Sequence, residues 1–254
     1  MSKYEIFSDY TTLNKKDASD FMANISKLAD EAFKNSDNKT RLLGNLVILE
    51  QYFNTLKDGL NKNDEKPSSI TYKSIDMLWD YLYGKIKPSD FEDFANNLYA
   101  CVLEYMVGED LTDEQSEFYE NNFPNDNISS IEWQIIGWIS YLLLELTAIH
   151  GGKINFDEFK SCDFIDFVSI DEILNILSDA CIDFAEVECK SNMAKDVIKA
   201  FEDVCVTPLF QSIIIKIQKS LKEALDAKPE DYQNLRNKQC SILPQEFAVD
   251  FLEF

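Results

Sequence analysis

Apolar residues recur at helical spacing along almost the whole chain, with polar turns between the periodic stretches. The most apolar stretch, Ile131–His150, places apolar side chains on nearly every face of a helix. A helix that is apolar all round belongs in a core or in a membrane. Its densest apolar run, Ile135–Leu144, covers about half of the roughly 20 residues that cross a bilayer, and Glu132 and Glu145 flank it. We therefore predict a central buried helix with other helices packed on several sides.

The same periodicity predicts further helices, and local signals place their ends. The expected helices cover residues 17–35, 40–60, 70–83, 88–108, 112–122, 170–189 and 193–227, the last with a break at Pro208. Gly84 and Gly108 are expected just after the third and fourth helices. Thr112 with Gln115, and Ser169 with Glu172, have the spacing of capping boxes. Residues 153–168 read as short helices or a brief strand.

These elements predict an all-α protein, a single multi-helix domain of about eight to ten helices that spans residues 1–254. The seven glycines and six prolines leave little material for tight hairpins, and the linker at 61–69 is short. Residues 1–12 are expected to be extended or disordered. The deepest core should include the large apolar side chains Leu78, Trp79, Trp138, Leu142 and Leu146.

Charge changes this picture, because the formal net charge of −22 is concentrated in one part of the chain. Residues 86–187 hold only Lys87, Lys153 and Lys160 against 22 Asp and Glu, and carry −19 of the total. Such a field repels nucleic acid and anionic membranes and attracts basic surfaces. Aromatic and basic residues are not interleaved, which also argues against a nucleic-acid groove. The alternative is that the acidity serves solubility alone.

The compartment and the catalytic chemistry are constrained by what the sequence does not contain. The N-terminus has no apolar stretch of useful length, and the six cysteines form no CxxC pair, so we expect a cytoplasmic protein with reduced thiols. The single histidine, His150, falls at the end of the central helix, where the helix dipole favours it as a structural cap. No phosphate-binding glycine loop or zinc motif is present, and we predict no enzyme activity, cofactor or metal.

One alternative is a magnesium-dependent enzyme of the all-α nucleotide pyrophosphatase type. Four carboxylates share one side of a predicted helix at i, i+3 and i+4 spacing, namely Asp113, Glu114, Glu117 and Glu120. Enzymes of that type hold Mg²⁺ with such clusters and need a second set on a facing helix. Asp179 and Asp183 supply only a poor version of that second set, and a solvated acidic face is the commoner use of the pattern.

Part of the chain resembles a known family. The sequence from Arg41 to Leu46, RLLGNL, followed by Tyr52-Phe53, resembles a motif of the YjaG-like family of uncharacterised bacterial helical proteins. There an Arg, two apolar residues, Pro-Asn-Tyr and a nearby Phe open the second helix, and Ile75–Asp80 resembles a segment that follows. The resemblance covers residues 40–108 and departs from the motif where Gly44 replaces Pro and Leu46 replaces Tyr. It implies a polar pair between Arg41 and Asp76.

Similar helical patterns occur in predicted immunity proteins of bacterial polymorphic toxin systems, which bind a cognate toxin and block its active site. Joined to the charge map, this resemblance leads us to expect a non-enzymatic interaction protein that neutralises a basic toxin domain. A helical scaffold in a larger assembly is a further alternative. The expected partner-binding residues lie on the acidic helix and its flanks: Glu109, Asp110, Asp113, Glu114, Glu117, Tyr119, Glu120 and Phe123.

Overall fold

A computed structural model of the chain describes residues 4–123, 128–184, 194–244 and 247–248. Within these ranges all regular structure is helical, with eleven α-helices, four short 3-10 helices and no strand, which confirms the all-α prediction. The α-helices are α1 Lys15–Met22, α2 Ile25–Ala32, α3 Asn38–Lys62, α4 Ser69–Leu82, α5 Glu92–Val107, α6 Asp113–Asn122, α7 Ser130–Ile149, α8 Val168–Phe184, α9 Ala194–Val204, α10 Pro208–Asp226 and α11 Tyr232–Lys238. The 3-10 helices are η1 Tyr10–Thr12, η2 Pro88–Asp90, η3 Asp157–Phe159 and η4 Pro229–Asp231.

The predicted central helix is α7, and it is buried as expected. Leu142 and Leu146 are at most 3% exposed, and α7 packs against α5, α4 and α3. Leu78, Trp79 and Trp138 are buried too, so the predicted core is confirmed. Among the described residues, no helix is both long and apolar enough to cross a bilayer.

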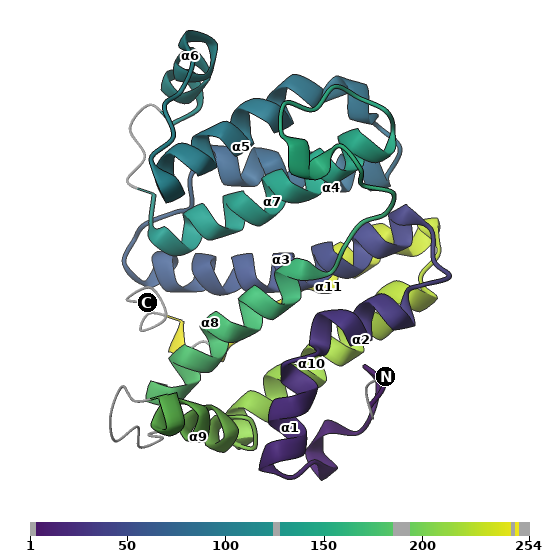
Figure 1. Cartoon of the computed structure of the whole chain (residues 1–254), viewed down its shortest axis with the longest axis vertical. Coiled ribbons are helices and arrows are strands. Elements are labelled where there is room, and N and C mark those ends of the chain that lie inside the picture. Colours follow the sequence, from purple (N-terminus) through teal and green to yellow (C-terminus); the bar gives the residue numbers. More distant parts are fainter. Residues whose placement is uncertain (1–3, 124–127, 185–193, 245–246, 249–254) are drawn as a thin grey trace.

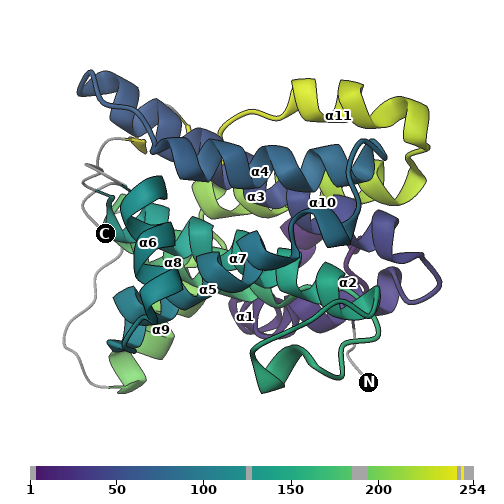
Figure 2. The same cartoon turned by 90° about the horizontal axis from the view of Figure 1, so that it is seen from above.

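The helix that joins the two halves of the fold is α3. Figure 1 shows it between α4, α5 and α7 on one side and α8, α10, α1 and α2 on the other. It contacts α4, α7, α8 and α10, and also α11, which lies along its outer side (Figure 2). Its buried residues include polar ones such as Asn45, Gln51 and Thr55. The core is therefore built on two buried helices, α3 and α7.

Several predicted helix ends are confirmed. Gly84 and Gly108 follow α4 and α5 with φ of 71° and 74°, a left-handed conformation that glycine adopts without a steric penalty. Pro208 is the first residue of α10, and Thr207 caps that helix with its side chain. The break expected in the 193–227 region is therefore the gap between α9 and α10.

Other predicted boundaries are wrong. The helix expected over 17–35 is two helices, because the chain leaves helical geometry at Asn24, whose side-chain amide donates to the Asp20 carbonyl at 2.8 Å. Pro88 starts the short helix η2 instead of α5. Helix α8 begins at Val168, one residue before its expected cap Ser169.

The N-terminal segment is packed onto the fold, against the expectation that residues 1–12 are extended or disordered. Within the described residues of that segment, Ile6 and Tyr10 are 1% exposed. The Tyr10 hydroxyl donates to the Cys205 carbonyl at 3.0 Å, and the Gln218 amide donates to the Ile6 carbonyl at 2.7 Å. Two buried side chains and these long-range hydrogen bonds offset the entropy of ordering the segment.

Candidate protein-interaction surface

Helix α6 projects at one end of the molecule, beyond the end of α5 (Figure 1). It packs against α5, but none of its ten residues is buried. The predicted capping box is present: the Thr112 amide donates to Gln115 Oε1 at 2.8 Å, and the Gln115 amide donates to Thr112 Oγ1 at 3.3 Å. Local capping therefore fixes the start of a helix that has no buried residue.

Six exposed carboxylates lie on α6 and on the link that precedes it. We call them the acidic surface: Glu109, Asp110, Asp113, Glu114, Glu117 and Glu120. Within the described part of the chain, none of them forms an ion pair with Lys or Arg. A lysine reaches the far end of α6, where the Lys73 ammonium donates to Asn122 Oδ1 at 3.4 Å. The negative charge of this surface therefore has no counter-ion among the described residues.

The C-terminal end of α5 adds to this negative potential. A helix C-terminus carries a partial negative charge from its unpaired carbonyl groups, and cations stabilise it. The last turn of α5 has no basic residue. It carries Glu104 instead, and Glu109 and Asp110 follow directly after Gly108. Carboxylates at this end are electrostatically unfavourable in the free protein, and a bound cation would relieve that cost.

Four aromatic rings form a continuous stack beside these carboxylates, and we call it the aromatic stack. The ring centroids are 4.9 Å apart for Tyr119 and Phe123, 5.2 Å for Phe123 and Trp133, and 4.7 Å for Trp133 and Tyr105. Adjacent rings are nearly parallel, with interplanar angles of 12–19°. The stack ties α6 to α7 and α5 through apolar contact.

The aromatic stack changes the roles expected of two predicted anchors. Phe123 packs on Trp133 and is only 6% exposed, so little of its side chain is accessible, and its role as a contact residue for a partner stays a prediction. Tyr119 is half-buried. Phe123 therefore supports the surface from below, and the contact with Trp133 of α7 could not be read from the sequence around α6.

The exposed apolar residues of this region lie one helix earlier, in the last turn of α5. Tyr105, Met106 and Val107 are 43%, 55% and 66% exposed, and we call these three residues the α5 patch. The sequence predicts a helix over residues 88–108 that includes this turn, but the exposure of the turn was not expected. The available signal was the acidic context, because three consecutive apolar residues between Glu104 and Glu109 cannot all face a core on one helix.

The structure gives no support to the magnesium alternative. Among the described residues, no group of three His, Cys, Asp or Glu side chains is placed to hold a metal ion. Asp113, Glu114 and Glu117 lie on α6, which packs on α5. The Asp183 side chain, part of the second carboxylate set, lies outside the described residues.

His150 lies at the C-cap of α7, as predicted. Its Nε2 atom is 2.9 Å from the Tyr81 hydroxyl, and the two rings meet edge to face. Gly151 follows in the left-handed conformation with φ of 73°. The contact joins the end of α7 to α4. The absence of a catalytic role for His150 stays a prediction.

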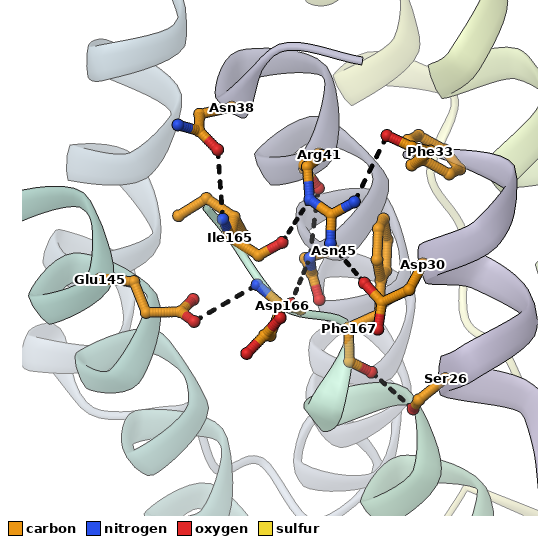
Figure 3. Close-up of polar contacts among 10 residues, drawn as sticks. All are labelled: Ser26, Asp30, Phe33, Asn38, Arg41, Asn45, Glu145, Ile165, Asp166 and Phe167. Atoms are coloured by element: carbon orange, nitrogen blue, oxygen red, sulfur yellow. Dashed lines mark hydrogen bonds and ion pairs between the residues drawn. The ribbon is translucent and has the colours of Figure 1, made fainter. Parts of the chain in front are cut away.

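Arg41 occupies a buried polar site (Figure 3). The expected pair between Arg41 and Asp76 does not form, so that prediction is wrong. Arg41 pairs with Asp30 of α2, and Asp76 pairs with Arg236 of α11, with 2.5 Å between Arg236 Nη2 and Asp76 Oδ1. Each of these ion pairs joins a helix within residues 40–108 to a helix outside that range, α2 for Arg41 and α11 for Asp76. A motif confined to residues 40–108 could not predict them.

The remaining Arg41 contacts hold the segment that leads into α8. Its Nε atom donates to the Ile165 carbonyl at 2.5 Å, and Nη1 donates to the Phe33 carbonyl at 3.3 Å. The guanidinium also lies over the rings of Phe164 and Phe167, 5.0 and 5.2 Å from their centroids. Arg41 therefore combines an ion pair, backbone hydrogen bonds and cation–π contacts in one site.

Residues 165–167 belong to no helix, and side chains from elsewhere form hydrogen bonds with their backbone groups (Figure 3). Besides Arg41, the partners are Asn38 for the Ile165 amide (3.2 Å), Asn45 for the Asp166 carbonyl (3.0 Å), Glu145 for the Asp166 amide (3.3 Å) and Ser26 for the Phe167 carbonyl (2.7 Å). Buried backbone groups must find partners, and irregular segments cannot supply them internally. The site is therefore a structural clamp between α2, α3 and α7.

Glu145 is the most perturbed acid of this clamp. Its side chain is fully buried, and within the described structure its Oε2 atom has no hydrogen-bond partner. Loss of water raises the pKa of Glu145 to about 9, and the nearby Asp166 adds to the rise. Burial also raises the pKa of Asp30 and of Asp166, while Arg41 opposes both shifts. Glu145 is therefore protonated at neutral pH.

Comparison of the chain with protein-family models, with curated proteins and with solved structures gave no match. The resemblance of residues 40–108 to the YjaG-like family therefore stays a prediction. The polar pair that it implied, Arg41 with Asp76, is not present. The function of this chain has to be argued from its own surface.

Proposed function

We propose that this protein is a non-enzymatic interaction protein that binds a basic protein partner through the acidic surface. The observation that carries the proposal is the set of exposed carboxylates on and before α6, which have no ion pair within the described residues. No Lys or Arg occurs between Lys87 and Lys153, so α5, α6 and α7 contain none. A surface of this kind accelerates the association of a positively charged partner and makes the rate sensitive to salt.

The specific form we propose is an immunity protein that neutralises a basic toxin domain. A nuclease presents Lys and Arg residues where it binds phosphates, and carboxylates on a fixed scaffold compete for those residues. The capping box and the aromatic stack support this form, because together they hold α6 in place without burying its carboxylates. Preorganised charges lose less entropy on binding than mobile ones.

The test starts from capture of a basic partner by the whole protein at low salt. Reversing Asp113, Glu114 and Glu117 to Lys should weaken the captured partner's affinity at least about tenfold and flatten its salt dependence. The matched control reverses Asp20, Glu65 and Glu230, which are also exposed but lie outside the acidic surface. It makes the same change in net charge and should alter the affinity much less.

Two results would count against the proposal. Equal effects of the two triple variants would mean that net charge matters and that the acidic surface has no special role. Failure to capture any basic partner at low salt would mean that the acidity serves solubility, which favours a helical scaffold in a larger assembly.

A further inference from the structure

The α5 patch differs from the exposed apolar residues of α9 in the charge of its neighbours. On α9, the exposed residues Val197 and Ile198 lie between Lys195 and Lys199. The α5 patch has only carboxylates beside it in the chain, with Glu104 before it and Glu109 and Asp110 after it. Exposed apolar groups that adjoin each other commonly mark interaction sites. Here that apolar surface lies within a strongly negative field.

The Tyr105 ring is packed on one face and the residue is still exposed. One face stacks on Trp133 at 4.7 Å between centroids, yet the residue is 43% exposed. Among the described residues, no Lys or Arg lies over this ring. A cation is attracted to the open face of a tyrosine ring, and more strongly when carboxylates are nearby. Met106 and Val107, the next two residues in the same turn of α5, are also exposed.

We propose that the α5 patch binds a basic protein segment that also carries apolar side chains. Its apolar side chains pack on Met106 and Val107, and an Arg or Lys lies on the open face of Tyr105. The complementarity of charge argues for this occupant, because the carboxylates around the patch and the C-terminal end of α5 both favour cations. The inference rests on the proposed function and deepens it, since it states which chemistry the partner must present.

A second copy of this chain is the competing occupant. Helix α9 offers lysines beside exposed apolar residues, and Figure 1 places α6 and α9 at opposite ends of the molecule. Contact between the two ends would be head-to-tail and would build rings or open chains of molecules. The net charge of −22 on each copy opposes such growth, especially at low salt. We therefore favour a different, basic protein.

The experiment uses two labelled synthetic peptides of equal length and positive charge, and the whole protein. In one peptide arginines alternate with leucines, and in the other every leucine is replaced by serine. Fluorescence anisotropy at low salt should show that the leucine peptide binds about tenfold more tightly, the order expected for burial of one or two apolar side chains. The variant with Met106→Ser and Val107→Ser should lose this preference and keep its binding of the serine peptide.

The matched control makes the same kind of change elsewhere, with Val197→Ser and Ile198→Ser on α9. It should keep the tenfold preference, and circular dichroism should show both variants folded, because all four side chains are at least 46% exposed. Equal binding of both peptides by the unmodified protein would overturn the inference and leave the proposed function standing. Binding of neither peptide would overturn both.

Two further results would contradict the proposed contact or its occupant. Loss of the preference in the α9 control alone would place the apolar contact on α9. Self-association of the unmodified protein that Met106→Ser with Val107→Ser abolishes, measured by sedimentation at low salt, would identify a second copy as the occupant and overturn the proposal of a basic partner.

Discussion

Arg41 shows how much of the stability of this fold rests on one charged residue. Replacing it with Met keeps much of its volume but removes the partner of Asp30 and the donors to two backbone carbonyls. We expect Arg41→Met to lower the free energy of unfolding by about 3 kcal/mol, since breaking a buried pair leaves polar groups unsatisfied.

Urea denaturation measures this change, with Lys34→Met as the control. Lys34 pairs with Glu31 at the surface, where both side chains are more than half exposed. Surface pairs of this kind contribute less than about 1 kcal/mol. A loss for Arg41→Met no larger than that of the control would show that Arg41 is not a clamp.

Glu145 gives the clamp an unusual pH dependence. Its pKa of about 9 in the folded protein lies above the ordinary value, so the folded state binds the proton more tightly than the unfolded state. The stabilising effect is complete below the ordinary pKa of a glutamate and is lost as the pH rises through the folded-state pKa. Glu145→Gln should remove this pH-dependent contribution to the free energy of unfolding. Between pH 5 and pH 8, the slope of stability against pH should become less negative by up to about 1.4 kcal/mol per pH unit.

Denaturation of the Gln variant and the unmodified protein across that pH range measures the difference. The same pH slope in both proteins would mean that Glu145 is ionised in the folded state, in conflict with its burial and unpartnered oxygen.

At the scale of elements, α7 is a buried helix whose packing can be tested at one position. Leu142 is 3% exposed, and Leu142→Ala should cost about 2–5 kcal/mol of unfolding free energy through lost burial and a cavity. Ile215 on α10 is 45% exposed and serves as the control, with an expected loss below about 1 kcal/mol for Ile215→Ala. Thermal or urea unfolding distinguishes the two, and similar losses would contradict the central position of α7.

Hydrophobic periodicity predicted most of the helices because it is a local property of the chain. It did not predict the importance of α3, because Arg41, Asn45 and Gln51 are polar residues at positions that are buried. Their partners lie far away in sequence, as with the Gln51 amide and Ser220 Oγ, which are 2.5 Å apart. In the sequence, a buried polar residue looks like a residue on the surface.

The candidate surface was predictable to a similar extent. The capping box and the carboxylates of α6 follow from residues a few positions apart, so the sequence located them correctly. The burial of Phe123 and the exposure of Tyr105 depend on Trp133 of α7, which comes later in the chain. Stacking between helices decides which of these aromatic side chains is buried and which is exposed. Such contacts between distant parts of the chain cannot be read from the local sequence.

For the molecule as a whole, charge should limit stability. The net charge is −22, and the carboxylates on and before α6 have no internal partner within the described residues. Repulsion among like charges destabilises a compact state, and salt screens it. We expect the melting temperature at pH 8 to rise when sodium chloride is added. The triple Lys variant at Asp113, Glu114 and Glu117 should show a smaller rise. A melting temperature that falls with salt would indicate that ion pairs within the protein outweigh this repulsion.

The aromatic stack gives the protein an internal optical reporter. The indole N–H groups of Trp79 and Trp138 donate to Glu50 and Glu172. Trp133 alone lies directly beneath Tyr105 of the α5 patch. A molecule that binds to Tyr105 changes the polarity around the Trp133 indole. The surroundings of Trp79 and Trp138 stay the same. Emission from Trp133, isolated by replacing Trp79 and Trp138 with Phe, would therefore follow occupancy of this end of the molecule in real time without an attached dye.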